Sequence, residues 1–217
     1  MKTAFQLAKQ AVSAYLNNFF DVCSEEEKEN HNVFYHGSQN EKITVNSEEN
    51  LKDVLSNWFN GIFLAFDKDD AESHSPTVHR FLLDCRKIAS LTVLEDDYWE
   101  VAKATVKEEL NLKQDDEVLL VLDYVFENNR VFLQANKEED NWWKEDKEPS
   151  EIEKLKNIFK EEDLGYIDWQ IQGLAGKIAK KAGFSGVYLH DEHGTSILLV
   201  EDGLKSLETI ELEKMGL

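Results

Sequence analysis

Three polar or small residues, His36, Gly37 and Ser38, follow an apolar run and could together bind a ligand. The preceding Val-Phe-Tyr run has the composition of a strand, and a polar turn follows it. A strand that ends in this way presents one imidazole and a backbone edge, and a glycine lets a flat ligand approach that edge closely. Residues 33–38 are therefore the centre of a candidate binding site. The alternative is an ordinary strand that runs into a turn, with His36 packed or solvated at its end.

The elements that must position this site can be predicted from apolar periodicity and from helix start and stop signals. No regular succession of strands and helices is present, so we expect an α+β fold and no long parallel sheet. The elements expected in the first part of the chain are a helix over 3–20, a strand over 33–38, a helix over 47–59, a strand over 61–67, a helical turn over 69–74, a strand over 78–85 and an extended piece over 88–94.

The second part of the chain is expected to be mainly helical before it returns to strands. Residues 118–126 fit either a helix or a hairpin strand, and we favour a helix because their apolar residues have helical spacing and acidic residues precede them. Gly173 and Gly176 are expected to permit close packing of a helix on the sheet. The elements expected here are helices over 99–110, 115–126, 150–159 and 167–181, and strands over 186–189 and 196–200 that a hairpin turn joins.

The order of these elements resembles the ADP-ribosyltransferase superfamily, in particular the small domains of phage polyvalent and head-associated proteins and of bacterial toxins. The resemblance implies small, split or bent sheets flanked by helices, and NAD as the substrate from which ADP-ribose is transferred to a protein or other macromolecule. The length of the chain suggests a single domain over 1–217, in which the stretch at about 97–165, which the resemblance does not explain, is an acidic helical insertion. The segments that carry the resemblance are 33–38, 61–67, 69–74, 182–189, 196–200 and 204–207.

The resemblance also suggests how NAD would bind. In the superfamily, a histidine at a strand end contacts the adenosine-side ribose, and glycine backbone groups hold the nicotinamide carboxamide. These roles fall on His36 and Gly37, with Ser38 beside them. Phe63 takes the position of an aromatic or hydroxyl residue near the nicotinamide ring, where it can stack but cannot donate a hydrogen bond. The chain has no Gly-x-Gly-x-x-Gly after a strand and no Walker loop, so it carries neither a Rossmann nor a P-loop site.

The superfamily's catalytic acid has no simple counterpart in this sequence. That glutamate begins a late strand, holds the ribose 2′-hydroxyl and stabilises the positive charge that develops as nicotinamide leaves. Here the matching strand begins with Thr195 and Ser196. Glu192, in the preceding turn, is the candidate catalytic residue, and Glu201, at the far end of the strand, is the alternative. A chain without the acid would instead be an inactive member that binds a partner.

The composition limits the partners. The formal net charge of −20 repels polyanions, which argues against direct nucleic-acid binding and favours a basic protein partner, such as the target of a phage-type inhibitor. No apolar stretch is long enough to span a membrane and no signal peptide is apparent, so the expected location is the cytoplasm, that of the host if a phage encodes the chain. Cys23 and Cys85 lack metal-site spacing, so we expect no zinc site and no disulfide framework.

Overall fold

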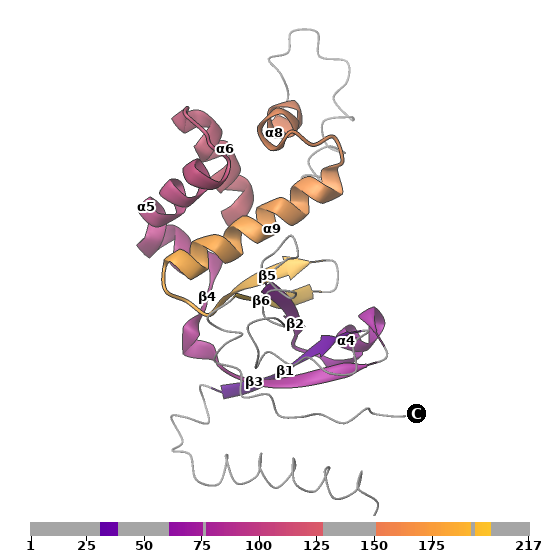
Figure 1. Ribbon diagram of the computed structural model, residues 1–217. Helices are drawn as coiled ribbons and strands as arrows, with labels where there is room; N and C mark the ends of the chain where they lie inside the picture. Colours follow the sequence, from indigo (N-terminus) through magenta and orange to yellow (C-terminus); the bar gives the residue numbers. More distant parts are fainter. Residues whose placement is uncertain (1–30, 39–60, 76, 128–150, 192–193, 201–217) are drawn as a thin grey trace, which may run out of the picture.

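The computed structural model describes residues 31–38, 61–75, 77–127, 151–191 and 194–200 (Figure 1). The helices predicted at 3–20 and 47–59 lie outside these residues. The described strands are β1 (His31–Gly37), β2 (Gly61–Ala65), β3 (Val78–Asp84), β4 (Ile88–Ala89), β5 (Gly186–Asp191) and β6 (Gly194–Val200). The described helices are α4 (Lys68–His74), α5 (Leu91–Glu109), α6 (Asp115–Phe126), α8 (Glu151–Phe159) and α9 (Leu164–Lys181), with a short 3₁₀ helix, η1 (Cys85–Lys87).

The strands form one mixed sheet in the order β3-β1-β2-β6-β5-β4, in which only β4 and β5 are parallel. β1 pairs with β3 along its whole length, and β2 pairs likewise with β6. By contrast, the described pairing of β1 with β2 is confined to Tyr35 and Ala65. We call the place where these two strands diverge, beside Gly37 of β1 and Phe63 of β2, the split. The predicted α+β fold with a split or bent sheet is therefore confirmed.

Helices α9 and α5 pack on one face of the sheet, and α6 and α8 pack on these two helices (Figure 1). The apolar residues of the four helices share a core with those of β5 and β6. Gly176 of α9 lies directly over β6, because a Cβ atom at this position would be 2.7 Å from Cδ2 of Leu198. The predicted close packing of α9 on the sheet is thus confirmed at Gly176. The helix ends before Gly183, which has a φ of 91°.

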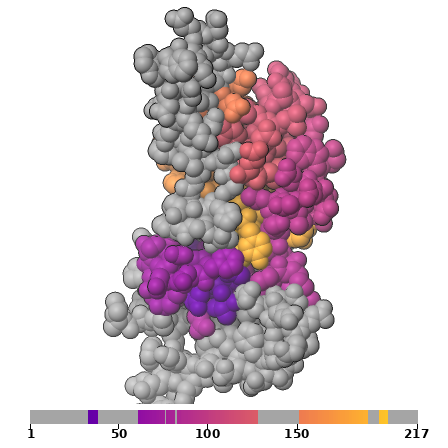
Figure 2. All heavy atoms as spheres, turned by 180° about the vertical axis from the view of Figure 1, so that it is seen from behind, coloured from indigo at the N-terminus to yellow at the C-terminus, as the bar shows by residue number. Residues whose placement is uncertain are grey.

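A second apolar core lies on the opposite face of the sheet. Its buried members alternate along each strand with residues that face the helices, as expected for a sheet covered on both sides. They are Phe34, Ile62, Leu64, Phe81, Leu83, Ile88, Ile197 and Leu199. Seen from behind, atoms of the β5–β6 region lie between the α5–α6 helices and the purple segment that contains α4 and β3 (Figure 2).

The beginning of α5 differs from the sequence-based expectation. An extended piece was expected over 88–94, but β4 covers only Ile88–Ala89 and α5 begins at Leu91. The side chain of Ser90 caps this helix by accepting a hydrogen bond from the N–H of Val93 at 3.2 Å. A kink follows at Tyr98, whose φ of −125° is not helical. The regular periodicity that begins at Trp99 reflects only the part of α5 beyond this kink.

The ambiguous segment at 118–126 is helical, as predicted. It belongs to α6, whose first turn contains Asp115, Asp116 and Glu117, near the positive end of the helix dipole. Helices α6 and α8 and most of α5 fall within residues 97–165, yet they pack with α9 and with the sheet in one continuous core. The single domain over 1–217 and the status of 97–165 as an insertion stay predictions. None of the described helices is long and apolar enough to cross a bilayer.

Candidate functional site

His36 lies near the end of β1 and bridges the split. Its Nδ1 atom is 2.7 Å from the backbone carbonyl oxygen of Phe63 on β2. A carbonyl oxygen can only accept a hydrogen bond, so the contact assigns the proton to Nδ1. The other ring nitrogen, Nε2, then carries a lone pair and can accept a hydrogen bond from a ligand hydroxyl.

The surroundings of His36 keep its imidazole neutral. Burial is the main cause that lowers its pKa, and the nearby side chains of His79 and His74 lower it further. The carbonyl of Phe63 opposes this effect without reversing it. His79 is buried and lies directly opposite His36 in the β1–β3 pairing, while His74 ends α4. At neutral pH the site therefore presents an uncharged imidazole with an acceptor nitrogen.

Gly37 directs its backbone groups into the split. In an antiparallel sheet, successive residues of an inner strand point their N–H and C=O groups to opposite neighbours. Ser38 donates its N–H to Thr77 beside β3 at 2.8 Å, so Gly37 must face the β2 side. The Tyr35↔Ala65 pair would place Gly37 opposite Phe63, but the described pairing of β1 and β2 does not extend that far. An N–H donor and a C=O acceptor are thus directed into the region between the diverging strands.

The absence of a side chain at Gly37 has a structural cause that sequence inspection did not predict. A Cβ atom here would be 2.1 Å from the carbonyl oxygen of Ala71 in α4. Ser75, which caps α4, donates its hydroxyl to the carbonyl of Ser38 at 2.6 Å. Helix α4 therefore holds the end of β1 in place, and the backbone of Ser38 takes part in that contact.

Phe63 contributes to the site through its backbone. Its ring is partly buried against the core of helices and sheet, and its carbonyl is the group that contacts His36. Phe66, which follows β2 and is not among the residues predicted for the site, is 45% exposed, and its ring lies 6.0 Å from that of Tyr188 in a stacked arrangement. The sequence feature that could have indicated Phe66 is its position as a large aromatic residue directly before the acidic first turn of α4. The stacking role of the Phe63 ring stays a prediction.

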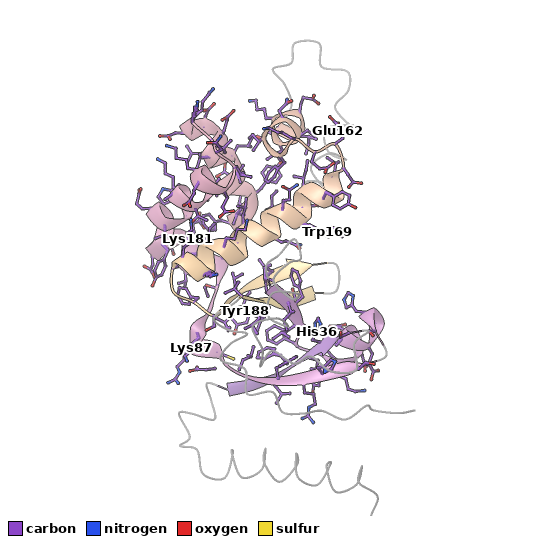
Figure 3. The ribbon with its side chains drawn as sticks, in the orientation of Figure 1. His36, Lys87, Glu162, Trp169, Lys181 and Tyr188 are labelled. Atoms are coloured by element: carbon purple, nitrogen blue, oxygen red, sulfur yellow. The ribbon has the colours of Figure 1, made fainter. Side chains whose placement is uncertain are left out.

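The position expected for the catalytic acid is occupied by a serine. Glu192 and Glu201 lie outside the described residues, so the catalytic assignment of Glu192 stays a prediction. Ser196, which stands where the superfamily's glutamate is expected, is buried in β6 and pairs with Ala65 and Leu189. Figure 3 shows His36 on the side of the molecule to which the N-terminal part of α9 extends, marked by Trp169.

Comparisons with known proteins identify the family. The model of the family described as "Anti-CRISPR Type I-F ADP-ribosyltransferase AcrIF11" matches residues 32–206, which include every candidate site residue. A solved structure titled "Crystal structure of an anti-CRISPR protein" is 21% identical, with a TM-score of 0.47 over 78% of this chain and 90% of that chain. A search of curated proteins finds no match. Because the family model covers most of the sequence, the chain belongs to the anti-CRISPR type I-F ADP-ribosyltransferase AcrIF11 family.

Proposed function

We propose that this protein cleaves the bond between nicotinamide and ribose in NAD and transfers ADP-ribose to a protein. Membership of an ADP-ribosyltransferase family supports this chemistry. The observation that carries the proposal is the split, where neutral His36 and the backbone groups of Gly37 face the same gap between β1 and β2. These groups suit a ligand that combines a flat carboxamide with ribose hydroxyls.

Each residue of the split would have a defined task. The N–H and C=O groups of Gly37 complement the C=O and NH₂ groups of a carboxamide, which would fix the nicotinamide ring. The Nε2 atom of His36 would accept a hydrogen bond from a ribose hydroxyl, and the carbonyl of Phe63 holds the imidazole in the required tautomer. Glu192 would supply the negative charge that stabilises the developing positive charge on the ribose, with Glu201 as the alternative acid.

The acceptor of ADP-ribose is proposed to be a protein in the cytoplasm of the host cell. The family description names type I-F anti-CRISPR proteins, so the proposed target is a protein of a type I-F CRISPR system. The net charge of −20 favours a target with a basic surface, because opposite charges accelerate encounter. Loops and exposed surfaces away from the split would select the acceptor.

Calorimetry with NAD, followed by a nicotinamide-release assay, tests this function. Replacing His36 with alanine removes one hydrogen bond to the ribose, so nicotinamide release should fall about tenfold to a hundredfold. The control is Arg86→Ala, which removes an exposed guanidinium that is paired with Asp84 and should leave the rate near that of the wild type. Absence of NAD binding by the wild-type protein would refute the transferase proposal.

A second candidate function is binding without catalysis, and one surface feature favours it. Tyr166 and Trp169 of α9 are 40% and 46% exposed, and their rings meet edge to face at 5.3 Å. The acidic residues Glu161, Glu162 and Asp163 immediately precede α9. An aromatic pair beside carboxylates suits the arginine and lysine side chains of a basic protein.

Capture of a basic partner distinguishes the two candidate functions. If the protein only binds, Trp169→Ala should release the partner, and higher salt should weaken the complex, while NAD and His36→Ala should have no effect. If the protein is a transferase, the same Trp169→Ala variant should still release nicotinamide from NAD at the wild-type rate. Retention of the partner by Trp169→Ala would remove the support for this surface.

A further inference from the structure

Two buried side-chain atoms in the described part of the chain have no hydrogen-bond partner, Nε of Arg80 and Oγ of Ser196. Buried polar atoms in native proteins are nearly always satisfied, because an unpaired donor or acceptor loses its hydration without compensation. Ser196 is only 6% exposed. Each of these two atoms therefore requires an explanation, and a bound ligand would provide one.

Both residues belong to a single row that crosses the sheet. Arg80 of β3 pairs with Tyr35 of β1, Tyr35 pairs with Ala65 of β2, and Ala65 pairs with Ser196 of β6. Directly paired residues project their side chains from the same face, so Arg80 and Ser196 share the face on which α9 lies. Three strand spacings separate their Cα atoms, roughly 14 Å. Between them, Ala65 contributes only a methyl group.

This row borders the split. Tyr35 and Ala65 form the last described pair between β1 and β2, and Gly37 and Phe63 lie two residues further along the same strands. His36, adjacent to Tyr35 in β1, projects from the opposite face of the sheet, together with Phe34, and reaches the carbonyl of Phe63 across the split. Because the described strands β1 and β2 are not paired at Gly37, the split connects the two faces. A ligand held between the diverging strands could therefore contact the imidazole from one face and extend along the row toward Arg80 on the other.

Arg80 is a half-buried cation in a strongly acidic protein. Within the described residues, Arg80 has no ion pair, although the chain contains 44 acidic residues. Several more exposed basic side chains have carboxylate partners. The described ion pairs are Lys68 with Glu72, Arg86 with Asp84, Lys103 and Lys107 with Asp115, Lys156 with Glu162, Lys177 with Glu109, and Lys181 with Glu108.

We propose that the row formed by Arg80, Tyr35, Ala65 and Ser196 is the subsite for the phosphate and ribose groups of the dinucleotide. Arg80 binds a phosphate oxygen, because a guanidinium matches phosphate geometry and carries a permanent positive charge. Ser196 exchanges a hydrogen bond with a ribose hydroxyl, which satisfies its buried Oγ atom. This inference rests on the proposed function, since it supplies the binding groups that His36 and Gly37 do not.

Binding of ADP-ribose, which has both phosphates and both riboses but no nicotinamide, tests the subsite directly. By calorimetry, Arg80→Met should weaken ADP-ribose binding about tenfold or more, and Arg80→Lys should weaken it less. Neither change should alter binding of nicotinamide riboside, which has no phosphate. The matched control is Arg86→Met, which removes an exposed guanidinium paired with Asp84 and should leave ADP-ribose binding unchanged.

Ser196→Ala separates a binding role from a structural one. Removing an unsatisfied buried hydroxyl should raise the melting temperature of the free protein, and the same change should weaken ADP-ribose binding. Thr105→Val is the control, because the Thr105 hydroxyl is also buried but donates to the carbonyl of Val101 at 2.7 Å. This variant should lower the melting temperature and leave ADP-ribose affinity unchanged.

The outcomes distinguish this inference from the proposed function. Wild-type affinity for ADP-ribose in both Arg80→Met and Ser196→Ala, or no binding by the wild type, would overturn the subsite. If ADP-ribose binding depends on Arg80 but no nicotinamide is released from NAD, the subsite stands and the transferase proposal fails. If nicotinamide is released from NAD but Arg80→Met binds ADP-ribose with wild-type affinity, the subsite fails and the transferase proposal stands.

Discussion

Replacement of Gly37 with alanine should destabilise the protein and disturb the split. The added Cβ atom would be 2.1 Å from the carbonyl oxygen of Ala71, whereas real Cβ atoms essentially never come closer than 3.0 Å to such a neighbour. The end of β1 and the last turn of α4 must therefore move apart by about 1 Å. Both partners are backbone atoms, so rotation of a side chain cannot relieve the contact. Overpacking of this kind costs about 1–3 kcal/mol.

Urea denaturation and thermal melting measure this effect. For a chain of this length, 1 kcal/mol corresponds to about 2–4 °C, so the melting temperature should fall by roughly 2–12 °C. Gly176→Ala is the matched control. Its Cβ atom would meet the flexible end of Leu198 at 2.7 Å, and the gain in helix propensity offsets that contact, so stability should change by less than about 1 kcal/mol. Equal stability of Gly37→Ala and the wild type would refute the packing of α4 against β1.

Two further predictions concern pH and helix capping. Burial lowers the pKa of His36, so the stability that its neutral form contributes is present above about pH 6.5 and is lost as the pH falls through the lowered folded value. Urea titrations of the wild type and His36→Gln between pH 8 and 5 should show a shallower decline in the variant, and identical declines would contradict the shift. Asp163→Ala removes a side-chain cap that accepts from the N–H of Gly165 at 2.8 Å, and should lower the free energy of unfolding by about 1 kcal/mol. Gln114→Ala, at an N-cap whose side chain makes no capping hydrogen bond, should change it by less than about 0.5 kcal/mol, and equal losses in both variants would refute the capping argument.

Apolar periodicity predicted most of the described elements, because buried residues recur with helical spacing in the helices and at every second position in the strands. Strand β1 and the long helix α9 follow directly from their apolar patterns. The start of α5 was not predictable in the same way, because the residues after Ser90 are β-branched or apolar, a composition that is also typical of a strand. The capping hydrogen bond of Ser90 to Val93 decides the outcome, and it depends on a local geometry that periodicity does not report.

The candidate site was only partly accessible from the sequence. A histidine followed by glycine at a strand end indicated His36 and Gly37, but the partner of the imidazole is the backbone carbonyl of Phe63, which has no sequence signature. The shared row of Arg80 and Ser196 depends on the registers of three strand pairs, and one of them, that of β2 with β6, joins segments more than 100 residues apart in the chain. Long-range register is set by tertiary packing, so residue spacing along the chain cannot specify it.

A crystal structure of the protein with bound NAD would show whether the split is the active site. We expect the nicotinamide carboxamide to form hydrogen bonds with the backbone N–H and C=O of Gly37, and Nε2 of His36 to lie within hydrogen-bond distance of a ribose hydroxyl. NAD bound elsewhere on the molecule, with the backbone of Gly37 and Nε2 of His36 making no contact to it, would contradict the assignment of the split as the active site.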